Sequence, residues 1–328
     1  MSATPAWRRP RAAALLALGL GACRAAPIPE AERWPGAAGQ THDHVVDGTR
    51  LRVLDSGAGP PVVFIHGLGA SIYSWRSVLE PVRRAGHRVI AFDNRGFGLS
   101  ERPDSGYGND AYTRLVVAVL DSLGIADAVL VGHSMGGAIA AQVAIEHPAR
   151  VRGLVLIGPA GFGVSEPWTL RAARLPIAGR LAAVLRGRWT VAQLLRSTYG
   201  DPSRVTRHDI DQYYAVAAVP RSTVALRGVF REFRFDSLRG RLGRIAAPTL
   251  LIWGAQDRWI PMHLGQDMAL ELPNGALVAV PGAGHNVQEE RPDQVVQPLL
   301  AFLRDGLPRP PADLAMGHRR RLTSQLIS

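Results

Sequence analysis

The amino-acid sequence predicts an α/β fold, with a mostly parallel eight-stranded sheet flanked by helices and an inserted helical lid. From residue 43 onward, short apolar runs alternate with helical patterns. The alternation stops at residue 161, and only helical or irregular patterns follow as far as residue 244. Because strand patterns then resume, residues 161–244 are predicted to be a lid, and residues 43–160 and 245–304 the core.

Eight segments have the pattern of strands, and the first two are polar enough to form an antiparallel hairpin at the edge of the sheet. Asp47-Gly48 lies between them and is typical of a hairpin turn. The strands are expected near residues 44–46, 51–55, 62–65, 89–92, 128–131, 154–157, 249–253 and 276–280.

Helical patterns occupy the connections between these strands, at about residues 75–84, 110–123, up to 146, and 293–303. The last of these contains Pro298. A proline inside a helix costs about 3 kcal/mol unless the helix kinks or begins late.

The composition fits a water-soluble globular core, with 47% hydrophobic and 20% charged residues. All 38 basic residues are arginine, and the formal net charge is +11. The segment between Glu166 and Arg244 has 15 arginines and six acids, so it carries most of this charge. No nucleic-acid-binding module or interleaved aromatic pattern accompanies it, so nucleic acid is not expected as a partner. A solvated surface is the simplest interpretation, and a lid facing anionic lipid or an anionic substrate is the alternative.

The N-terminus is typical of a bacterial lipoprotein signal peptide. Arg8, Arg9 and Arg11 precede a short apolar segment, and Leu20-Gly21-Ala22-Cys23 matches the cleavage motif that leaves a lipidated cysteine. Cys23 is the only cysteine in the chain. We expect residues 1–22 to be the signal, 23–42 a flexible tether and 305–328 a mobile tail. The protein is then exported and anchored by lipid on Cys23 in a bacterial envelope membrane; plain secretion is the alternative.

The spacing Gly132-x-Ser134-x-Gly136 predicts a nucleophile elbow. The turn from strand to helix is tight there, so glycines are needed on both sides of the serine. The spacing alone is weak evidence because glycine and serine are common in this chain. An apolar strand before it and a helical pattern after it are the context that the motif requires.

A serine nucleophile needs a base, and the base needs an acid to orient it. Asp257 and His285 follow the last two predicted strands, in the expected order after Ser134 and at the same edge of the sheet. The loop after strand 154–157 is the other usual place for the acid, but it holds no carboxylate. Four other histidines fit the base worse, because two lie in helical segments, one precedes a strand and one adjoins Ser134: His208, His263, His87 and His133.

The oxyanion hole is predicted to use two backbone N–H groups. One is that of Met135, directly after the nucleophile, and the other is that of Leu68 in the loop His66-Gly67-Leu68-Gly69. His66 is expected to brace this loop rather than to act in catalysis.

Residues 45–303 resemble the lidded serine hydrolase branch of the α/β-hydrolase superfamily. The resemblance rests on the elbow, Asp257-Arg258-Trp259-Ile260-Pro261, Gly284-His285, and two further strings: His66-Gly67-Leu68-Gly69-Ala70-Ser71 and Phe92-Asp93-Asn94-Arg95-Gly96-Phe97-Gly98-Leu99-Ser100. It implies no cofactor and no metal.

Epoxide hydrolases and haloalkane dehalogenases share the layout but use an aspartate nucleophile, so Ser134 excludes those reactions. Carbon–carbon bond hydrolases share the string from Asp257 to Pro261, but they usually have tryptophan where Asn286 follows the histidine. Leu68 argues against a haloperoxidase.

The expected activity is hydrolysis of small or medium apolar carboxylic esters through an acyl-enzyme. Carbon–carbon bond hydrolysis, perhydrolysis or acyl transfer on the same triad, and a non-catalytic ligand-binding role are the alternatives. The expected partner is a small-molecule ester, and the oligomeric state is left open. Apolar lid residues either line an acyl pocket or pack on the core: Leu170, Leu175, Ile177, Leu181, Val184 and Leu185.

Overall fold

The computed structural model describes residues 41–162 and 187–307. Cys23, the predicted signal peptide, the apolar lid residues 170–185 and nearly all of the predicted tether and tail lie outside the described residues.

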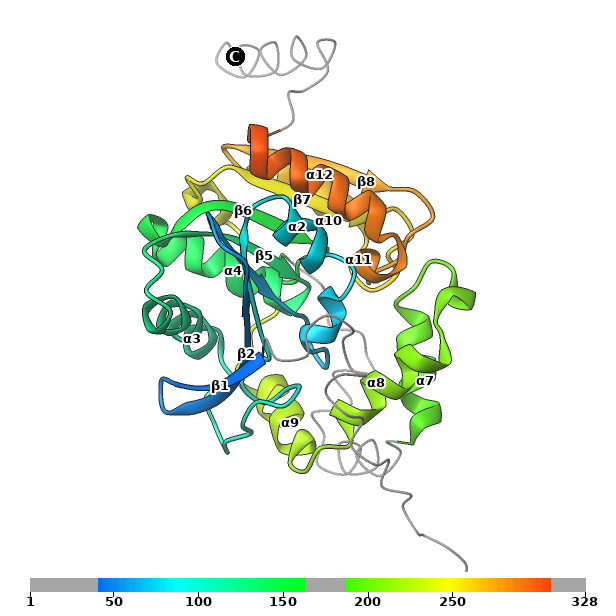
Figure 1. The fold of residues 1–328 in the computed structure, drawn as a ribbon. Coiled ribbons are helices and arrows are strands. Elements are labelled where there is room, and N and C mark those ends of the chain that lie inside the picture. The colour runs from blue at the N-terminus through cyan, green and yellow to red at the C-terminus, as the bar shows by residue number, and fades with distance from the viewer. Residues whose placement is uncertain (1–40, 163–186, 308–328) are drawn as a thin grey trace, which may run out of the picture.

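A single eight-stranded sheet organises the described chain, in the order β1-β2-β4-β3-β5-β6-β7-β8 (Figure 1). The first two pairings, β1 with β2 and β2 with β4, are antiparallel, and all others are parallel. The strands are β1 Thr41–Val46, β2 Thr49–Ser56, β3 Pro61–Ile65, β4 Arg88–Phe92, β5 Ala128–His133, β6 Val151–Ile157, β7 Thr249–Gly254 and β8 Gly275–Val280. The predicted fold class is therefore confirmed, including the antiparallel edge hairpin.

The edge hairpin turns at Asp47-Gly48, as predicted. Both residues have positive φ, 48° and 65°, and Val46 pairs with Thr49 across the turn. Positive φ at both central positions defines the tight turn whose twist matches that of paired strands.

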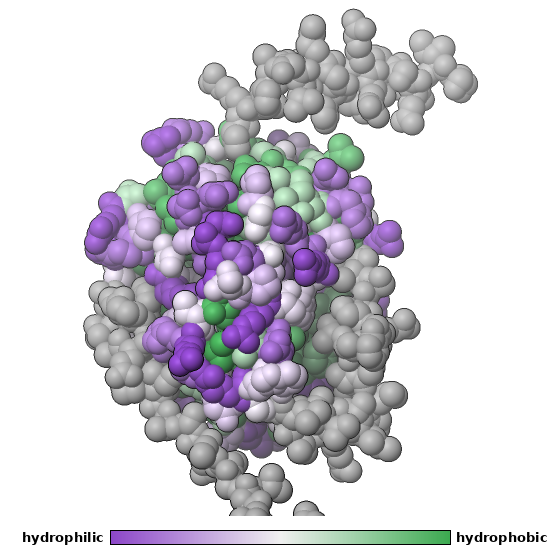
Figure 2. Space-filling view, turned by 90° about the vertical axis from the view of Figure 1, so that its right-hand side faces the viewer, coloured by the Kyte–Doolittle hydropathy of each residue, from purple (hydrophilic) through white to green (hydrophobic). Residues whose placement is uncertain are grey.

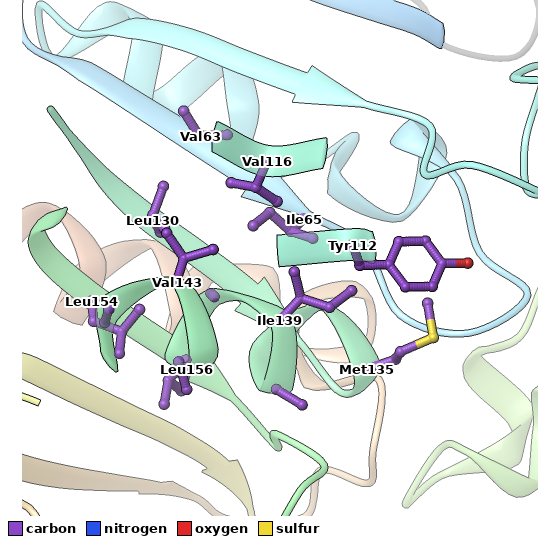
Figure 3. Close-up of a cluster of buried hydrophobic side chains, with 14 of the residues drawn as sticks. Val63, Ile65, Tyr112, Val116, Leu130, Met135, Ile139, Val143, Leu154 and Leu156 are labelled. Atoms are coloured by element: carbon purple, nitrogen blue, oxygen red, sulfur yellow. The ribbon is translucent and has the colours of Figure 1, made fainter. Parts of the chain in front are cut away.

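Helices cover both faces of the sheet. One face packs against α3 Asn109–Ser122, α4 Met135–Glu146 and α10 Met262–Glu271, and the other against α2 Leu79–Arg84 and α12 Pro292–Asp305. Figure 3 shows Ile139 and Val143 of α4 against Leu130 and Leu154 of the strands. The central strands β3 and β5 are buried on both faces, which explains their continuous apolar runs.

Between β6 and β7 the described chain is helical, as the sequence predicts. It contains α7 Arg188–Ser197, α8 Arg207–Ala217 and α9 Ser222–Glu232, with short 3₁₀ turns η3 Pro202–Arg204 and η4 Leu242–Arg244. In Figure 1, α7 and α8 lie at the lower right and α9 lies at the bottom centre. We refer to residues 187–244 as the insertion.

One local prediction needs correction. The helix expected over residues 75–84 is divided into η1 Ile72–Trp75 and α2. The N–H of Ile72 is bonded to Asp93 Oδ1 at 2.7 Å, and Ser71 caps η1, so helical structure begins earlier than the apolar pattern indicates.

The last helix is confirmed and runs through Pro298, from Pro292 to Asp305. Burial of Val295, Leu299 and Phe302 against the sheet offsets the cost of the proline. Two remaining short helices are η2 Pro148–Arg150 and α11 Val287–Glu290.

The surface of the described residues is mainly polar. Figure 2 shows the side that lies on the right in Figure 1, where hydrophilic side chains surround a small apolar area. Among residues 41–162 and 187–307, large hydrophobic side chains are exposed at Val45, Trp189, Leu194 and Leu270. No helix in these same two ranges has the length and apolar character to cross a membrane.

Candidate active site

Ser134 stands at the turn between β5 and α4, with φ 52° and ψ −117°. Positive φ is strained for a serine and is found at only two other non-glycine residues among those described, Asp47 and Arg221. The flanking glycines allow the turn, since a Cβ at Gly132 would lie 2.7 Å from Gly136 C and one at Gly136 2.6 Å from Ile65 C. This is the geometry that the spacing predicts.

The three predicted triad side chains lie together. His285 Nε2 is 2.9 Å from Ser134 Oγ, and His285 Nδ1 is 2.7 Å from Asp257 Oδ2. Asp257 and His285 are buried, whereas Ser134 is partly exposed and so accessible. With Asp257 ionised, the Nδ1–H of the imidazole donates to the carboxylate, which leaves Nε2 to accept the serine proton.

The carboxylate of Asp257 is itself held in place by its loop. Its Oδ1 accepts the N–H of Trp259 at 2.8 Å and that of Ile260 at 2.9 Å, and Oδ2 remains for the imidazole. The indole of Trp259 is nearly parallel to the imidazole of His285, with ring centroids 6.1 Å apart. Trp259 Nε1 also donates to Ser197 O of the insertion at 3.2 Å. Trp259 belongs to the string that carries the family resemblance, but neither its stacking on His285 nor its bond to Ser197 was predicted, because no local pattern marks either contact.

The loop after β6 lies against this pair, although it supplies no acid. Gly158 has φ 46°, and a Cβ there would lie 3.4 Å from Asp257 Oδ2 and 3.5 Å from His285 Nδ1. A Cβ at this position would make only ordinary van der Waals contacts with the two side chains. The backbone after β6 therefore lies within side-chain reach of the imidazole, although the acid comes from the loop after β7.

The predicted oxyanion loop lies beside the nucleophile. A Cβ at Gly67 would be 3.1 Å from Ser134 Cβ, so the loop bearing Leu68 lies next to the serine. Met135 is the first residue of α4, and its N–H has no carbonyl one turn earlier to bond. Both N–H groups thus belong to backbone segments adjoining Ser134.

His66 braces the oxyanion loop. Its Nε2 accepts the N–H of Asn94 at 2.9 Å, and its Nδ1–H donates to Gly67 O at 2.8 Å. Burial lowers the pKa of His66 to about 4, so the neutral ring that this bonding requires is present at neutral pH. Asp93 also braces backbone in this region, because its carboxylate accepts the N–H groups of Ile72 and Leu99, both at 2.7 Å. Burial raises the pKa of Asp93 to about 6, against the opposing effect of these hydrogen bonds.

His133 supports the loop that carries His285 and does not accept the proton of Ser134. Its Nε2–H donates to the carbonyl oxygen of His285 at 3.0 Å, and the two rings are 4.9 Å apart. Burial, and next the neighbouring His285, hold the pKa of His133 well below its usual value, so it stays neutral. Its exclusion as the base is consistent with this geometry.

A buried ionic cluster adjoins the site and was not predicted. Arg76 bridges Asp209 of α8 at 2.7 Å and Glu289 of α11 at 2.6 Å. Tyr73 donates to Asp209 at 2.8 Å, and Tyr213 donates to Glu289 at 2.6 Å. Burial raises the pKa of Glu289, with Arg76 opposing the effect. The cluster ties the segment after β3, the insertion and the segment after His285 together.

No group of three or more His, Cys, Asp or Glu side chains is arranged to hold a metal ion within the described residues.

Comparison with known proteins agrees with this fold. The model of the α/β hydrolase fold family matches residues 60–292. The chain is 31% identical over 271 residues to a 2-hydroxy-6-oxo-6-phenylhexa-2,4-dienoate hydrolase of Burkholderia cepacia, covering 78% of this chain and 92% of that protein. It is 30% identical over 263 residues to haloalkane dehalogenase 2 of Mycobacterium bovis, covering 76% of this chain and 90% of that one.

Among solved structures, a membrane phospholipase A described as a bacterial virulence factor superposes with a TM-score of 0.72 and 29% identity, covering 83% of this chain and 88% of that chain. The family match over the core, the sheet order and the relatives' activities together show that this chain belongs to the α/β-hydrolase superfamily and is a hydrolase.

Proposed function

We propose that this protein is a serine esterase that hydrolyses carboxylic esters with small or medium apolar acyl groups. The observation that carries the proposal is the continuous hydrogen-bonded line from Asp257 through His285 to Ser134, with 2.7 and 2.9 Å links. The serine stands on a strained elbow beside two backbone segments that present N–H groups. This arrangement fits acyl transfer through a tetrahedral intermediate.

In the proposed mechanism, His285 Nε2 takes the proton of Ser134 as Oγ attacks the ester carbonyl carbon. The N–H groups of Met135 and Leu68 hold the resulting oxyanion. Collapse breaks the bond to the leaving oxygen, which receives the proton from His285 and departs as the alcohol. Water then attacks the acyl-enzyme, loses a proton to His285, and the carboxylic acid leaves as Ser134 regains its hydrogen. Asp257 orients the imidazole and stabilises its charged form.

The direct test is labelling with a fluorophosphonate, followed by a panel of p-nitrophenyl esters of graded chain length. Label on Ser134 and turnover of short or medium esters are expected. Ser134→Ala should lose both, with kcat falling about a million-fold, and His285→Gln should fall to a similar level because the two groups act as a unit. Ser203→Ala is a matched control, since its hydroxyl bonds only within an exposed turn of the insertion. Retained ester turnover in Ser134→Ala would rule out this mechanism.

Carbon–carbon bond hydrolysis is the second candidate. It is favoured by the 31% identical relative that is named for such a substrate and by the string Asp257-Arg258-Trp259-Ile260-Pro261. Against it, the residue after His285 is Asn286, whose side chain donates to Glu289 at 3.0 Å and so belongs to the support of the loop. A 2-hydroxy-6-oxodienoate assayed beside the esters separates the two, because preference for the dienoate in kcat/KM would replace the esterase assignment.

We also propose that the protein is exported and held to an envelope membrane by lipid on Cys23. The support is the signal-like N-terminal sequence with the lone cysteine after Ala22. The similarity to a structure named as a membrane phospholipase A makes phospholipid vesicles a useful addition to the ester panel. Cells fed labelled palmitate should yield labelled protein in the membrane fraction. Cys23→Ser should abolish the label and release the protein, and label retained in that variant would contradict the anchor.

A further inference from the structure

The loop that carries His285 is in direct contact with the insertion. The N–H of Asn286 donates to Thr198 O at 3.1 Å. A Cβ at Gly200 would lie 2.5 Å from Gly282 O and 3.0 Å from Gly284 N, so the two backbones meet with no room for a side chain. The segment that follows α7, residues 198–200, therefore packs directly against the histidine loop, residues 281–286.

One buried carboxylate joins the two backbones. Glu290 is 2% exposed, and its Oε2 accepts the N–H of Gly284 at 2.7 Å and the N–H of Gly200 at 2.9 Å. Its Oε1 accepts the N–H of Asp201 at 2.8 Å. Hydrogen bonds to a carboxylate acceptor are stronger than bonds between neutral groups. Without this carboxylate, the three N–H groups would lose their acceptor at the contact between the insertion and the histidine loop, which we call the seam.

We propose that Glu290 is a positioning residue, which holds the backbone before His285 against the insertion and so sets the angle at which the imidazole meets Ser134. Gly284 immediately precedes His285, and His133 holds the carbonyl of His285 from the other side. The backbone at the histidine is thus bonded on both sides of its Cα. The inference rests on the proposed function, in which His285 is the general base.

A second carboxylate provides a matched control. Glu232 of α9 accepts the N–H of Gly106 at 3.1 Å and that of Tyr107 at 2.8 Å, so it also fastens the insertion to backbone of the core. Its hydrogen-bond partners are Gly106, Tyr107 and Arg231, and none of them belongs to the triad. If Glu290 only stabilises the fold, then Glu290→Gln and Glu232→Gln should have the same effect on kcat and on the proton resonance of His285.

The test measures two properties of Glu290→Gln and Glu232→Gln in the full-length protein. A glutamine fills the same space but turns its NH₂ toward N–H groups that need an acceptor. For Glu290→Gln we expect kcat for p-nitrophenyl butyrate to fall about 10- to 100-fold with a smaller change in KM, as for a reacting group displaced by up to about 1 Å. We expect the low-field proton resonance of His285 Nδ1–H, assigned by its loss in Asp257→Asn, to shift or broaden. Glu232→Gln should leave both at wild-type values.

The same seam can be perturbed from the insertion side if Glu290→Gln does not fold. Gly200→Ala places a methyl group against Gly282 O without changing any charge, and should reproduce the loss in kcat and the altered resonance. Gly187→Ala is its control, because a Cβ there meets nothing within 4 Å.

The proposal is overturned if the folded Glu290→Gln and Gly200→Ala proteins keep the wild-type resonance and kcat. Its failure is distinct from failure of the esterase assignment. The imidazole resonance reports the Asp257–His285 geometry whether or not an ester is the substrate. If wild-type Ser134 takes no fluorophosphonate, the esterase proposal fails while this readout still decides the role of Glu290.

Discussion

Moving the catalytic acid to a neighbouring loop tests whether Asp257 acts by orienting His285. Asp257→Asn leaves the imidazole next to an amide, which does not select the required tautomer. We expect kcat/KM to fall about 10,000-fold, as in other triads. At about 1.36 kcal/mol per tenfold, this is about 5.4 kcal/mol of transition-state stabilisation.

Adding Gly158→Asp to Asp257→Asn should restore part of this loss. The Cβ at residue 158 would lie 3.5 Å from His285 Nδ1, within reach of one carboxyl group. Two effects limit the recovery. The φ of 46° at this position costs a non-glycine residue about 1–2 kcal/mol, and the new carboxylate lacks the two N–H donors that hold Asp257. Regaining about 2 kcal/mol would raise kcat/KM about 30-fold above Asp257→Asn.

The assay is hydrolysis of an activated short-chain ester, with circular dichroism to verify folding. Gly158→Asn in the Asp257→Asn background is the matched control, because it has the same shape and backbone strain without the charge. The reasoning is refuted if the asparagine restores as much activity as the aspartate, or if a folded Gly158→Asp protein restores none.

Three further predictions concern stability, each measured by urea unfolding. Arg76→Met should lower the free energy of unfolding by about 3–5 kcal/mol, since it leaves the buried carboxylates of Asp209 and Glu289 without their shared partner; a loss below about 1 kcal/mol would show that the cluster is not coupled. Burial lowers the pKa of folded His66 from its ordinary value of 6.5 to about 4, so the stability it contributes is full above pH 6.5 and is lost as pH falls toward 4. The free energy of unfolding of His66→Gln should therefore fall less than that of the wild type between pH 7 and 4. Equal falls for the two proteins would contradict this. Pro298→Ala should raise the free energy of unfolding by about 1–3 kcal/mol by restoring a helical N–H, and an unchanged or lower value would contradict this.

The chemistry of the site could be predicted because local patterns determine it. The strained elbow at Ser134 requires glycines two residues before and after it, and that requirement is visible as a spacing. Asp257 and His285 each follow a strand, and parallel strands end at one edge of the sheet, so their proximity follows from the fold class. Even the absence of an acid after β6 could be seen in the sequence, and Gly158 proves to lie against the carboxylate.

The supports of that site could not be predicted in the same way. Glu289 and Glu290 look in sequence like a charged, solvated helix start, yet both are buried. Arg76 meets Glu289 across 213 positions of sequence, and Gly200 meets Glu290 across 90. No local pattern marks such pairs, because the partner of a buried charge is set by how the insertion packs on the core. The sequence by itself determined the fold class and which side chains meet at the candidate site. Only the tertiary structure decided what holds them, because desolvated carboxylates take whichever donors the packing brings within reach.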